Sequence, residues 1–275
     1  MIYRLLKKPF FGRYQKPWRW PAQVPDAGWE RVRIDSESGA KLHGLFARAH
    51  GPARGAVVCA HPMGVDAKGF FLKRGHAELL RDNGYDVLLF DFNGFGESPS
   101  GNFSYPLDVI AAGRKLQELS PGQPLGLMGA SFGAAWSMCA LARPDHPFQA
   151  AALECPFTTL DEYWIRYRIP YYTLKTLNVL LPRIAAELRP IVQIARLSPL
   201  QELLLIYGDR DDVTPAQMGQ RFAAACSLPK EKVTLWTIPG AEHTKAFTHA
   251  PEEYRERVLA LFARTLVKTA PAASA

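Results

Sequence analysis

Short apolar runs alternate with longer amphipathic stretches along the chain, and this pattern predicts alternating strands and helices. The run at residues 56–60 holds only apolar side chains, which is typical of a strand buried on both faces of a parallel sheet. The order of the elements predicts an α/β protein with a mostly parallel, doubly wound sheet. Further strands are predicted at residues 29–34, 41–46, 87–90, 150–153, 203–207, 233–238 and the start of 124–133, and helices at residues 70–83, 134–142 and 251–266.

The first two predicted strands are connected differently from the others. The turn signal Ser-Glu-Ser-Gly at residues 36–39 separates them, which predicts an antiparallel hairpin at an edge of the sheet. The other strands alternate with helices, and open sheets of this kind bind ligands beyond the carboxyl ends of their strands. We therefore expect the functional site along that edge.

The segment 124–133 carries a serine between two glycines, in the order Gly-Ala-Ser-Phe-Gly at residues 129–133. This G-x-S-x-G spacing predicts a nucleophile elbow, a strained strand-to-helix turn that lifts the serine hydroxyl clear of the sheet. The backbone N–H of Phe132 then lies at a helix N-terminus, where it can donate to an oxyanion. Ser131 is the candidate nucleophile, and the alternative is a buried serine in an ordinary turn.

Two further motifs accompany the elbow, HPMG at residues 61–64 and DFNGFGES at residues 91–98. With them, nearly all of residues 28–266 resemble the α/β-hydrolase superfamily, specifically its small serine hydrolases with a lid. The resemblance implies the α/β-hydrolase fold with an N-terminal antiparallel edge and an inserted helical lid. It also implies that the backbone N–H groups of Met63 and Phe132 form the oxyanion hole.

The first motif departs from the family pattern at Pro62, where glycine is usual. Proline fixes φ near −65°, so this loop cannot copy a glycine with positive φ, although Met63 keeps its own N–H. By the same resemblance, His61 fixes the loop through local hydrogen bonds rather than acting as a base. Residues 91–98 are then a structural turn whose glycines permit tight backbone geometry.

A carboxylate must follow the strand at residues 203–207 in order to orient a catalytic imidazole. Asp209, Asp211 and Asp212 are all available there. The family spacing G-x-x-D selects Asp211, whereas Asp209 is suited to bracing the turn. Asp212 lies beside the start of the next helix, where a carboxylate is favourable in any case.

The chain order of the elbow hydrolases, serine, then acid, then histidine, leaves His243 and His249 as candidate bases. His243 follows the last predicted strand on a loop and matches the family spacing G-x-x-H. His249 is placed at the start of the final helix, which suits a surface or capping residue. Ser131, Asp211 and His243 therefore form the expected catalytic triad, and we expect it to need neither a metal nor an organic cofactor.

Residues 158–199 interrupt the alternation of strands and helices and form the candidate lid. The segment is rich in aromatic and aliphatic side chains, and prolines at four positions limit its helices. Trp164 and Tyr167 are candidate pocket residues that could cover an apolar acyl group. The alternative is that these side chains pack on the core and never meet a substrate.

Composition limits the remaining organisation of the chain. With 275 residues and 48% hydrophobic content, the chain can bury one large core, which we place at residues 28–275. The four cysteines are widely spaced within apolar runs, so they are expected to be reduced core residues of a cytoplasmic protein. No apolar run approaches the length of a membrane-spanning helix, about 18 residues.

The net charge of +7 arises mostly from an N-terminal arm, residues 1–27. Its first 25 residues hold six bases and no acid, interleaved with aromatic and aliphatic side chains. Two interpretations are open: the arm contacts an anionic membrane, or its aromatic side chains pack on the domain. Nucleic acid is not expected as a partner because the catalytic part of the chain has no basic stripe and no recognised binding motif.

Three functions are compatible with these features. The favoured one is a hydrolase of carboxylic esters, lipid esters or thioesters, acting on a small acyl substrate. The second is a peptidase of the same fold, and the third is a binding protein on a scaffold that has lost catalysis. Fold alone does not choose among them.

Overall fold

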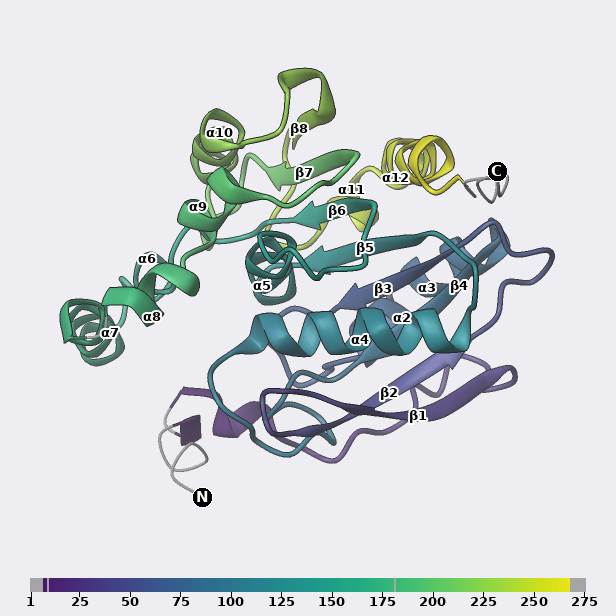
Figure 1. The fold of residues 1–275 in the computed structure, drawn as a ribbon, viewed down its shortest axis with the longest axis horizontal. Coiled ribbons are helices and arrows are strands. Elements are labelled where there is room, and N and C mark those ends of the chain that lie inside the picture. The colour runs from purple at the N-terminus through teal and green to yellow at the C-terminus, as the bar shows by residue number, and fades with distance from the viewer. Residues whose placement is uncertain (1–6, 9, 181, 268–275) are drawn as a thin grey trace, which may run out of the picture.

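The computed structural model describes residues 7–8, 10–180 and 182–267. Its described strands form one eight-stranded sheet in the order β1-β2-β4-β3-β5-β6-β7-β8 (Figure 1). The α/β-hydrolase architecture expected from the sequence is thereby confirmed. The strands are β1 (Trp29–Asp35), β2 (Lys41–Ala47), β3 (Gly55–Ala60), β4 (Tyr85–Phe90), β5 (Leu125–Ala130), β6 (Ala150–Glu154), β7 (Glu202–Gly208) and β8 (Val233–Ile238).

The hairpin lies at one edge of the sheet, as predicted. β1 pairs antiparallel with β2, and β2 pairs antiparallel with β4. From β4 to β8 every neighbouring pair is parallel. The carboxyl ends of the parallel strands therefore share one edge, and that edge carries the candidate site.

Helices cover both faces of the sheet because alternate side chains of its buried strands point to opposite sides. On one face, α4, α5 and α10 pack with side chains such as Val58 and Leu127. On the other, α2, α3 and α12 pack with side chains such as Cys59 and Met128. The helices are α2 (Gly69–Lys73), α3 (His76–Asp82), α4 (Tyr105–Leu119), α5 (Phe132–Leu141), α6 (Leu160–Tyr163), α7 (Arg168–Leu180), α8 (Pro182–Glu187), α9 (Pro190–Gln193), α10 (Ala216–Ala225), α11 (Ala246–His249) and α12 (Pro251–Thr265), with 3-10 turns η1 (Gly12–Tyr14), η2 (Ile194–Arg196) and η3 (Lys230–Lys232).

Two helical predictions need correction. The helix expected at residues 70–83 is divided into α2 and α3, because Gly75 takes the left-handed conformation with φ of 77° and breaks the hydrogen-bonded ladder. His249 does not start the last helix. It ends the short helix α11, and α12 begins two residues later at Pro251.

The inserted segment, residues 158–199, contains α6, α7, α8, α9 and η2. In Figure 1, α7 and α8 lie at one end of the molecule, outside the layers formed by the sheet and its covering helices. The beginning of the inserted segment is joined to its later part, where the Ile191 N–H donates to the Thr158 carbonyl at 3.1 Å. Arg221 of α10 also forms an ion pair with Glu162 of α6 at 3.0 Å, which ties the segment to the body.

The N-terminal arm packs on the domain along its described part. Phe11 and Trp18 are buried, and even the amino group of Lys7 is enclosed beside Asn93 and the ring of Tyr105. These contacts favour the packing interpretation for the aromatic side chains of the arm. Membrane contact through residues 1–25 stays a prediction, and residues 1–6 lie outside the described residues.

Two further expectations concern the cysteines and the membrane. Cys59, Cys139 and Cys155 are buried free thiols, and Cys226 is a half-buried free thiol, as expected from their apolar surroundings. No helix within the described ranges has both the length and the apolar character needed to cross a bilayer.

Candidate active site

Ser131 lies in the sharp turn between β5 and α5. Its φ of 49° and ψ of −111° are strained for a residue with a side chain, as the elbow motif predicts. The turn depends on the two flanking glycines. A Cβ on Gly133 would lie 2.0 Å from the Ala60 carbonyl oxygen, and one on Gly129 would lie 2.8 Å from Cα of Ala134.

The side chain of Ser131 meets two residues from distant loops. Its Oγ lies 2.9 Å from Nε2 of His243, in the loop after β8. Nδ1 of the same imidazole lies 2.7 Å from Oδ2 of Asp211, in the loop after β7. Because Asp211 can only accept when ionised, Nδ1 carries a proton and Nε2 is left to accept the serine proton. The structure thus brings together the three residues expected to form the triad.

The Asp211 carboxylate is fully enclosed and densely hydrogen-bonded. Its Oδ1 accepts from the backbone N–H groups of Val213 and Thr214, both at 2.8 Å, and Oδ2 accepts from the Thr214 hydroxyl at 2.8 Å. Burial on its own would raise the pKa of this carboxyl, but the hydrogen bonds from His243 and Thr214 outweigh it and lower the pKa. Asp211 is therefore ionised at neutral pH.

The other candidate acids and the other candidate base lie elsewhere. Asp209 is exposed, and its Oδ1 accepts from the Gly240 N–H at 2.5 Å, so it braces the turn beside the loop of His243. Asp212 is exposed, and its backbone carbonyl accepts from Arg166 at 2.9 Å. His249 is exposed at the end of α11. None of the three has a hydrogen bond to Ser131 or His243 within the described chain.

The loop after β3 lies beside the elbow because β3 and β5 are parallel neighbours, with Ala60 paired to Gly129. Phe132 is the first residue of α5, so its N–H has no acceptor within the helix. Across residues 7–8, 10–180 and 182–267, no protein acceptor takes the N–H of Phe132 or Met63. Both donors expected to form the oxyanion hole are thus unoccupied by protein.

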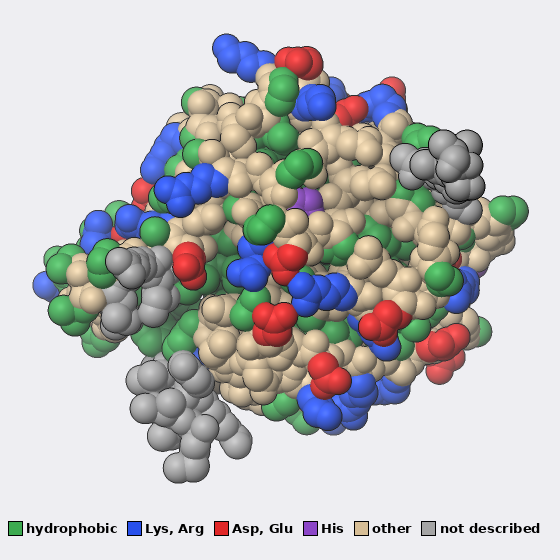
Figure 2. Space-filling view, viewed as in Figure 1, with side chains coloured by type: hydrophobic (Ala, Val, Ile, Leu, Met, Phe, Trp, Pro, Cys, Tyr) green, Lys and Arg blue, Asp and Glu red, His purple; other side chains and the backbone are tan. Residues whose placement is uncertain are grey.

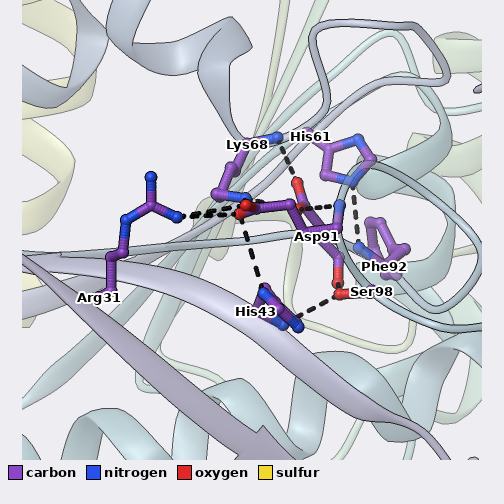
Figure 3. A network of polar contacts seen from close by, with 8 residues as sticks. Arg31, His43, His61, Lys68, Asp91, Phe92 and Ser98 are labelled. Carbon is purple, nitrogen blue, oxygen red and sulfur yellow. Dashed lines mark hydrogen bonds and ion pairs between the residues drawn. The ribbon is translucent and has the colours of Figure 1, made fainter. Parts of the chain in front are cut away.

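His61 holds the start of this loop, as the family resemblance implied. Its Nε2 accepts from the Phe92 N–H at 3.1 Å and its Nδ1 donates to the Pro62 carbonyl at 2.8 Å, contacts visible in part in Figure 3. One nitrogen accepts while the other donates, so the ring is neutral. Burial, the largest influence, lowers the pKa of His61, which agrees with that neutral state.

A buried ion pair holds the other end of the loop. Lys68 Nζ lies 2.6 Å from Asp91 Oδ2, and the Lys68 N–H donates to Asp91 Oδ1 at 2.9 Å (Figure 3). Both side chains are at most 1% exposed. Glu97 accepts from Lys68 at 2.8 Å, and the ring of Trp18 in the arm lies 4.7 Å from Nζ. Residues 61 and 68 are therefore both bonded to the turn at residues 91–98.

Two buried residues, Glu154 at the end of β6 and Cys155 directly after it, contact the residues of the candidate site. The Glu154 carbonyl accepts from the Ser131 N–H at 2.7 Å, and its Oε1 accepts from the Ala246 N–H at 3.0 Å. Burial raises the pKa of the Glu154 carboxyl. The Cys155 thiol shares one small region with the Asp211 carboxylate and the His243 imidazole, in which the potential metal-ligand atoms lie within 4.8 Å of one another. Burial is the main cause that raises the pKa of this thiol, so it is protonated at neutral pH.

Aromatic rings connect the elbow to the inserted segment. One series of ring contacts leads from Phe132 through Trp136, Phe157 and Tyr163 to Trp164, at centroid distances between 5.4 and 5.8 Å. A second passes through the arm. It leads from Phe132 through Phe11 and Phe10 to Trp164, at 5.8 to 6.2 Å. The side chains beside the candidate nucleophile are thus continuous with the insertion.

The two candidate pocket residues of the insertion occupy different environments. Trp164 is only 6% exposed and packs against Tyr163 and Phe10. Tyr167 is 58% exposed and touches the Trp164 ring at 5.4 Å. Trp164 therefore belongs to the core of the insertion, and Tyr167 lies at its surface.

Sequence reasoning missed Thr214 and Lys68. Thr214 follows Asp211 by three residues, and a hydroxyl at that spacing commonly bonds back to an Asp in a turn, so a local signal did exist. Lys68 carried no such signal, because its partner Asp91 is 23 positions away in the chain.

The α/β hydrolases place a strained serine at a strand-to-helix turn of a mostly parallel sheet. In these enzymes the serine is hydrogen-bonded to a histidine, and the histidine to a buried carboxylate, as Ser131, His243 and Asp211 are here. The family model described as serine aminopeptidase, S33, matches residues 51–201, and the chain belongs to this family of hydrolases. The Mycobacterium tuberculosis protein Rv2307c is 30% identical to this chain over 225 residues, and the alignment covers 77% of this chain and 71% of Rv2307c. The Escherichia coli protein YfhR is 28% identical over 242 residues, and that alignment covers 84% of this chain and 79% of YfhR.

Solved structures share the fold at lower sequence identity. The Pyrococcus furiosus esterase Pf2001 superposes with a TM-score of 0.73 at 22% identity, covering 92% of this chain and 97% of that one. An acylaminoacyl peptidase from Pyrococcus horikoshii has a TM-score of 0.64 at 16% identity, covering 90% of this chain and 43% of that one. Esterases and peptidases therefore both occur among the structures with this fold.

Proposed function

We propose that this hydrolase cleaves carboxylic esters, with Ser131 as nucleophile, His243 as general base and Asp211 as its orienting carboxylate. The observation that carries the proposal is the continuous hydrogen-bonded series from Ser131 Oγ to His243 at 2.9 Å and from His243 to Asp211 at 2.7 Å. These distances lie within the reach that proton transfer to a general base requires. The strained backbone of Ser131 supports the same assignment.

The reaction then proceeds in two halves. Nε2 of His243 removes the Ser131 proton while Oγ attacks the ester carbonyl carbon, and the N–H groups of Met63 and Phe132 stabilise the resulting oxyanion. The imidazolium gives its proton to the leaving alcohol as the tetrahedral intermediate collapses. Water, activated by the same imidazole, releases the carboxylic acid and restores the serine hydroxyl.

Apolar acyl groups are the proposed substrate class. The rings that connect Phe132 to Trp164, together with the half-buried side chain of Met63, give the region beside Ser131 an apolar character. In this proposal the inserted segment acts as a lid, with the exposed Tyr167 beside the acyl chain and the buried Trp164 supporting the Tyr167 ring at 5.4 Å. Medium-length acyl chains should therefore be preferred over acetyl groups.

A substrate panel tests the proposal. Purified protein should hydrolyse p-nitrophenyl esters of graded chain length, with kcat/KM rising from acetyl to medium-chain esters. Ser131→Ala should abolish turnover of every ester. Thioesters and aminoacyl amides belong in the same panel, and turnover of amides with none of esters would contradict the ester assignment.

A peptidase of the same fold is the second candidate, favoured by the description of the matched family and by the acylaminoacyl peptidase with the same fold. A peptidase that removes N-terminal residues needs an accessible carboxylate to hold the substrate amine. Glu154 lies near His243, but it is buried and its carboxylate already accepts from Ala246. Kinetics on matched aminoacyl amides and esters of the same acyl group decide between the two activities.

A further inference from the structure

The surface of the insertion carries an unusual concentration of exposed apolar side chains. Six large apolar residues between positions 165 and 180 are at least 58% exposed, while the other three in the described chain are single and scattered. Isolated exposed apolar residues are normal on proteins, but a contiguous group of them marks an interaction surface. The six are Ile165, Tyr167, Ile169, Tyr172, Val179 and Leu180.

Helix α7 arranges four of these residues along one side. Ile169, Tyr172, Val179 and Leu180 recur at helical spacing and fall within a stripe about 100° wide. Leu174 points to the opposite side, where it is half-buried and packs against the core. The helix thus has one apolar side facing the protein and a second apolar side that is exposed, where Tyr172 contacts the neighbouring ring of Tyr171 at 5.2 Å.

The charged residues of this segment are all of one sign. Residues 165–180 contain three bases and no acid. Arg166 and Arg168 border a shallow depression, open to solvent, whose lining also includes Tyr167, Ile169 and Tyr172. Arg168 is exposed and makes no ion pair within the described residues. Side chains that bring both apolar surface and positive charge are the combination that an anionic bilayer binds.

We propose that the exposed face of α7, defined by Ile169, Tyr172, Val179 and Leu180 with Arg168 beside it, docks the protein on an anionic lipid surface. The face stands at one end of the molecule, where Figure 1 shows α7 beyond the sheet and Figure 2 shows hydrophobic side chains interspersed with basic ones. The apolar side chains enter the headgroup region while the bases meet anionic headgroups. This assignment is independent of the proposed ester hydrolysis.

The described part of the arm is less suited to the same task. Phe11 and Trp18 are buried against the domain, so they cannot enter a bilayer without leaving the core. Its exposed bases, Lys8, Arg13, Lys16 and Arg19, add electrostatic attraction but little insertable apolar surface. Among the residues that the structure describes, the apolar contribution to membrane binding therefore comes mainly from α7.

Co-sedimentation with vesicles tests the docking face. The Ser131→Ala protein, which cannot consume lipid, is mixed with phosphatidylcholine vesicles with or without phosphatidylserine. We expect binding to the anionic vesicles only, weakened as salt rises above about 0.1 M. Ile169→Ser/Val179→Ser should reduce the binding constant at least about tenfold, because each side chain loses apolar burial. Arg168→Gln should reduce it about fivefold.

Matched variants separate this face from other surfaces. Val267→Ser removes an apolar side chain that is 57% exposed at the far end of the chain and should leave vesicle binding unchanged. Arg13→Gln/Lys16→Gln/Arg19→Gln should weaken binding without abolishing it. Ile169 and Val179 are about 80% exposed, so the melting temperature of the double variant should match that of the parent.

Three results would overturn the assignment. The first is no binding of the parent protein to anionic vesicles at low salt. The second is parent-level binding by both Ile169→Ser/Val179→Ser and Arg168→Gln, or complete loss in the arm variant alone. The third is a dimer in sedimentation velocity that the double variant dissolves, together with no vesicle binding, because a second copy would then be the occupant of the face.

Discussion

Replacing Asp211 by asparagine should disable the site by reversing the protonation of His243. The surroundings of the carboxylate dictate how the new amide sits. The Oδ1 atom of the native Asp211 faces two backbone N–H donors, from Val213 and Thr214, each at 2.8 Å. An amide NH₂ there would meet two donors, so the amide oxygen must occupy this position. The NH₂ group then takes the place of Oδ2 and points at Nδ1 of the imidazole, 2.7 Å away in the native protein.

The consequence falls on Ser131. A donor facing Nδ1 makes that nitrogen the acceptor, so the proton of the neutral ring moves to Nε2, the atom 2.9 Å from the serine hydroxyl. His243 then cannot accept the serine proton. By comparison with triads in which this exchange has been made, kcat should fall on the order of 10⁴-fold, or about 5.5 kcal/mol in activation free energy.

The assay is kcat for a soluble short-chain ester, measured for Asp211→Asn and for the control Asp209→Asn. The control changes a carboxylate that only braces the turn at Gly240, so it should affect the melting temperature more than kcat. Thermal melts of both variants show whether each is folded. A folded Asp211→Asn with more than a tenth of wild-type kcat would refute the tautomer argument, as would a larger catalytic loss in Asp209→Asn.

Three further predictions follow from particular contacts. Gly133→Ala places a Cβ 2.0 Å from the Ala60 carbonyl oxygen and so displaces the loop that carries Met63, the proposed second oxyanion donor. We expect kcat to fall on the order of 10²–10³-fold, whereas Gly51→Ala, in open space, should leave kcat unchanged. Tyr167→Ala should lower kcat/KM more for medium-chain than for acetyl esters, and an equal loss would leave the insertion without a role in acyl selection. Burial lowers the pKa of Lys7 from 10.5 to about 7, so the unfolded chain binds more protons than the native one between those values. Denaturant titrations should therefore show wild type gaining stability relative to Lys7→Met as pH rises from 7 to 10.5. At about 1.36 kcal/mol per pKa unit the gain in unfolding free energy is up to about 5 kcal/mol, and it is lost as pH falls back. If the difference in unfolding free energy between the two proteins does not change with pH, the burial of this amine is contradicted.

The sequence was most informative where structure depends on local pattern. Strands such as β3, which is buried throughout, and β8, at the sheet edge, are sharply bounded runs, and their predicted limits agree with the structure to within a residue. The strained turn at Ser131 could also be predicted, because only a particular arrangement of small residues permits it. The loops of Asp211 and His243 follow once the fold is assumed, since parallel strands end at one edge.

Features that depend on distant partners could not be predicted in this way. The Lys68–Asp91 pair and the burial of Lys7 beside Asn93 join residues 23 and 86 positions apart, and a lysine side chain is ordinarily solvated. The break at Gly75 was missed because one glycine within a helical pattern is usually tolerated at a small cost. The exposed face of α7 was equally hidden, since its apolar spacing is that of a helix packed on a core.

The most direct test of the account is to locate the covalent adduct of a fluorophosphonate by peptide mass spectrometry. The phosphorus of this probe is attacked by an activated serine, and the phosphoryl oxygen occupies the oxyanion hole, so labelling requires both halves of the site. The account predicts a single adduct on the peptide that contains Ser131, no adduct in Ser131→Ala, and much slower labelling in His243→Ala. An adduct on another serine, or labelling of Ser131→Ala at the wild-type rate, would contradict the assignment of Ser131 as the nucleophile.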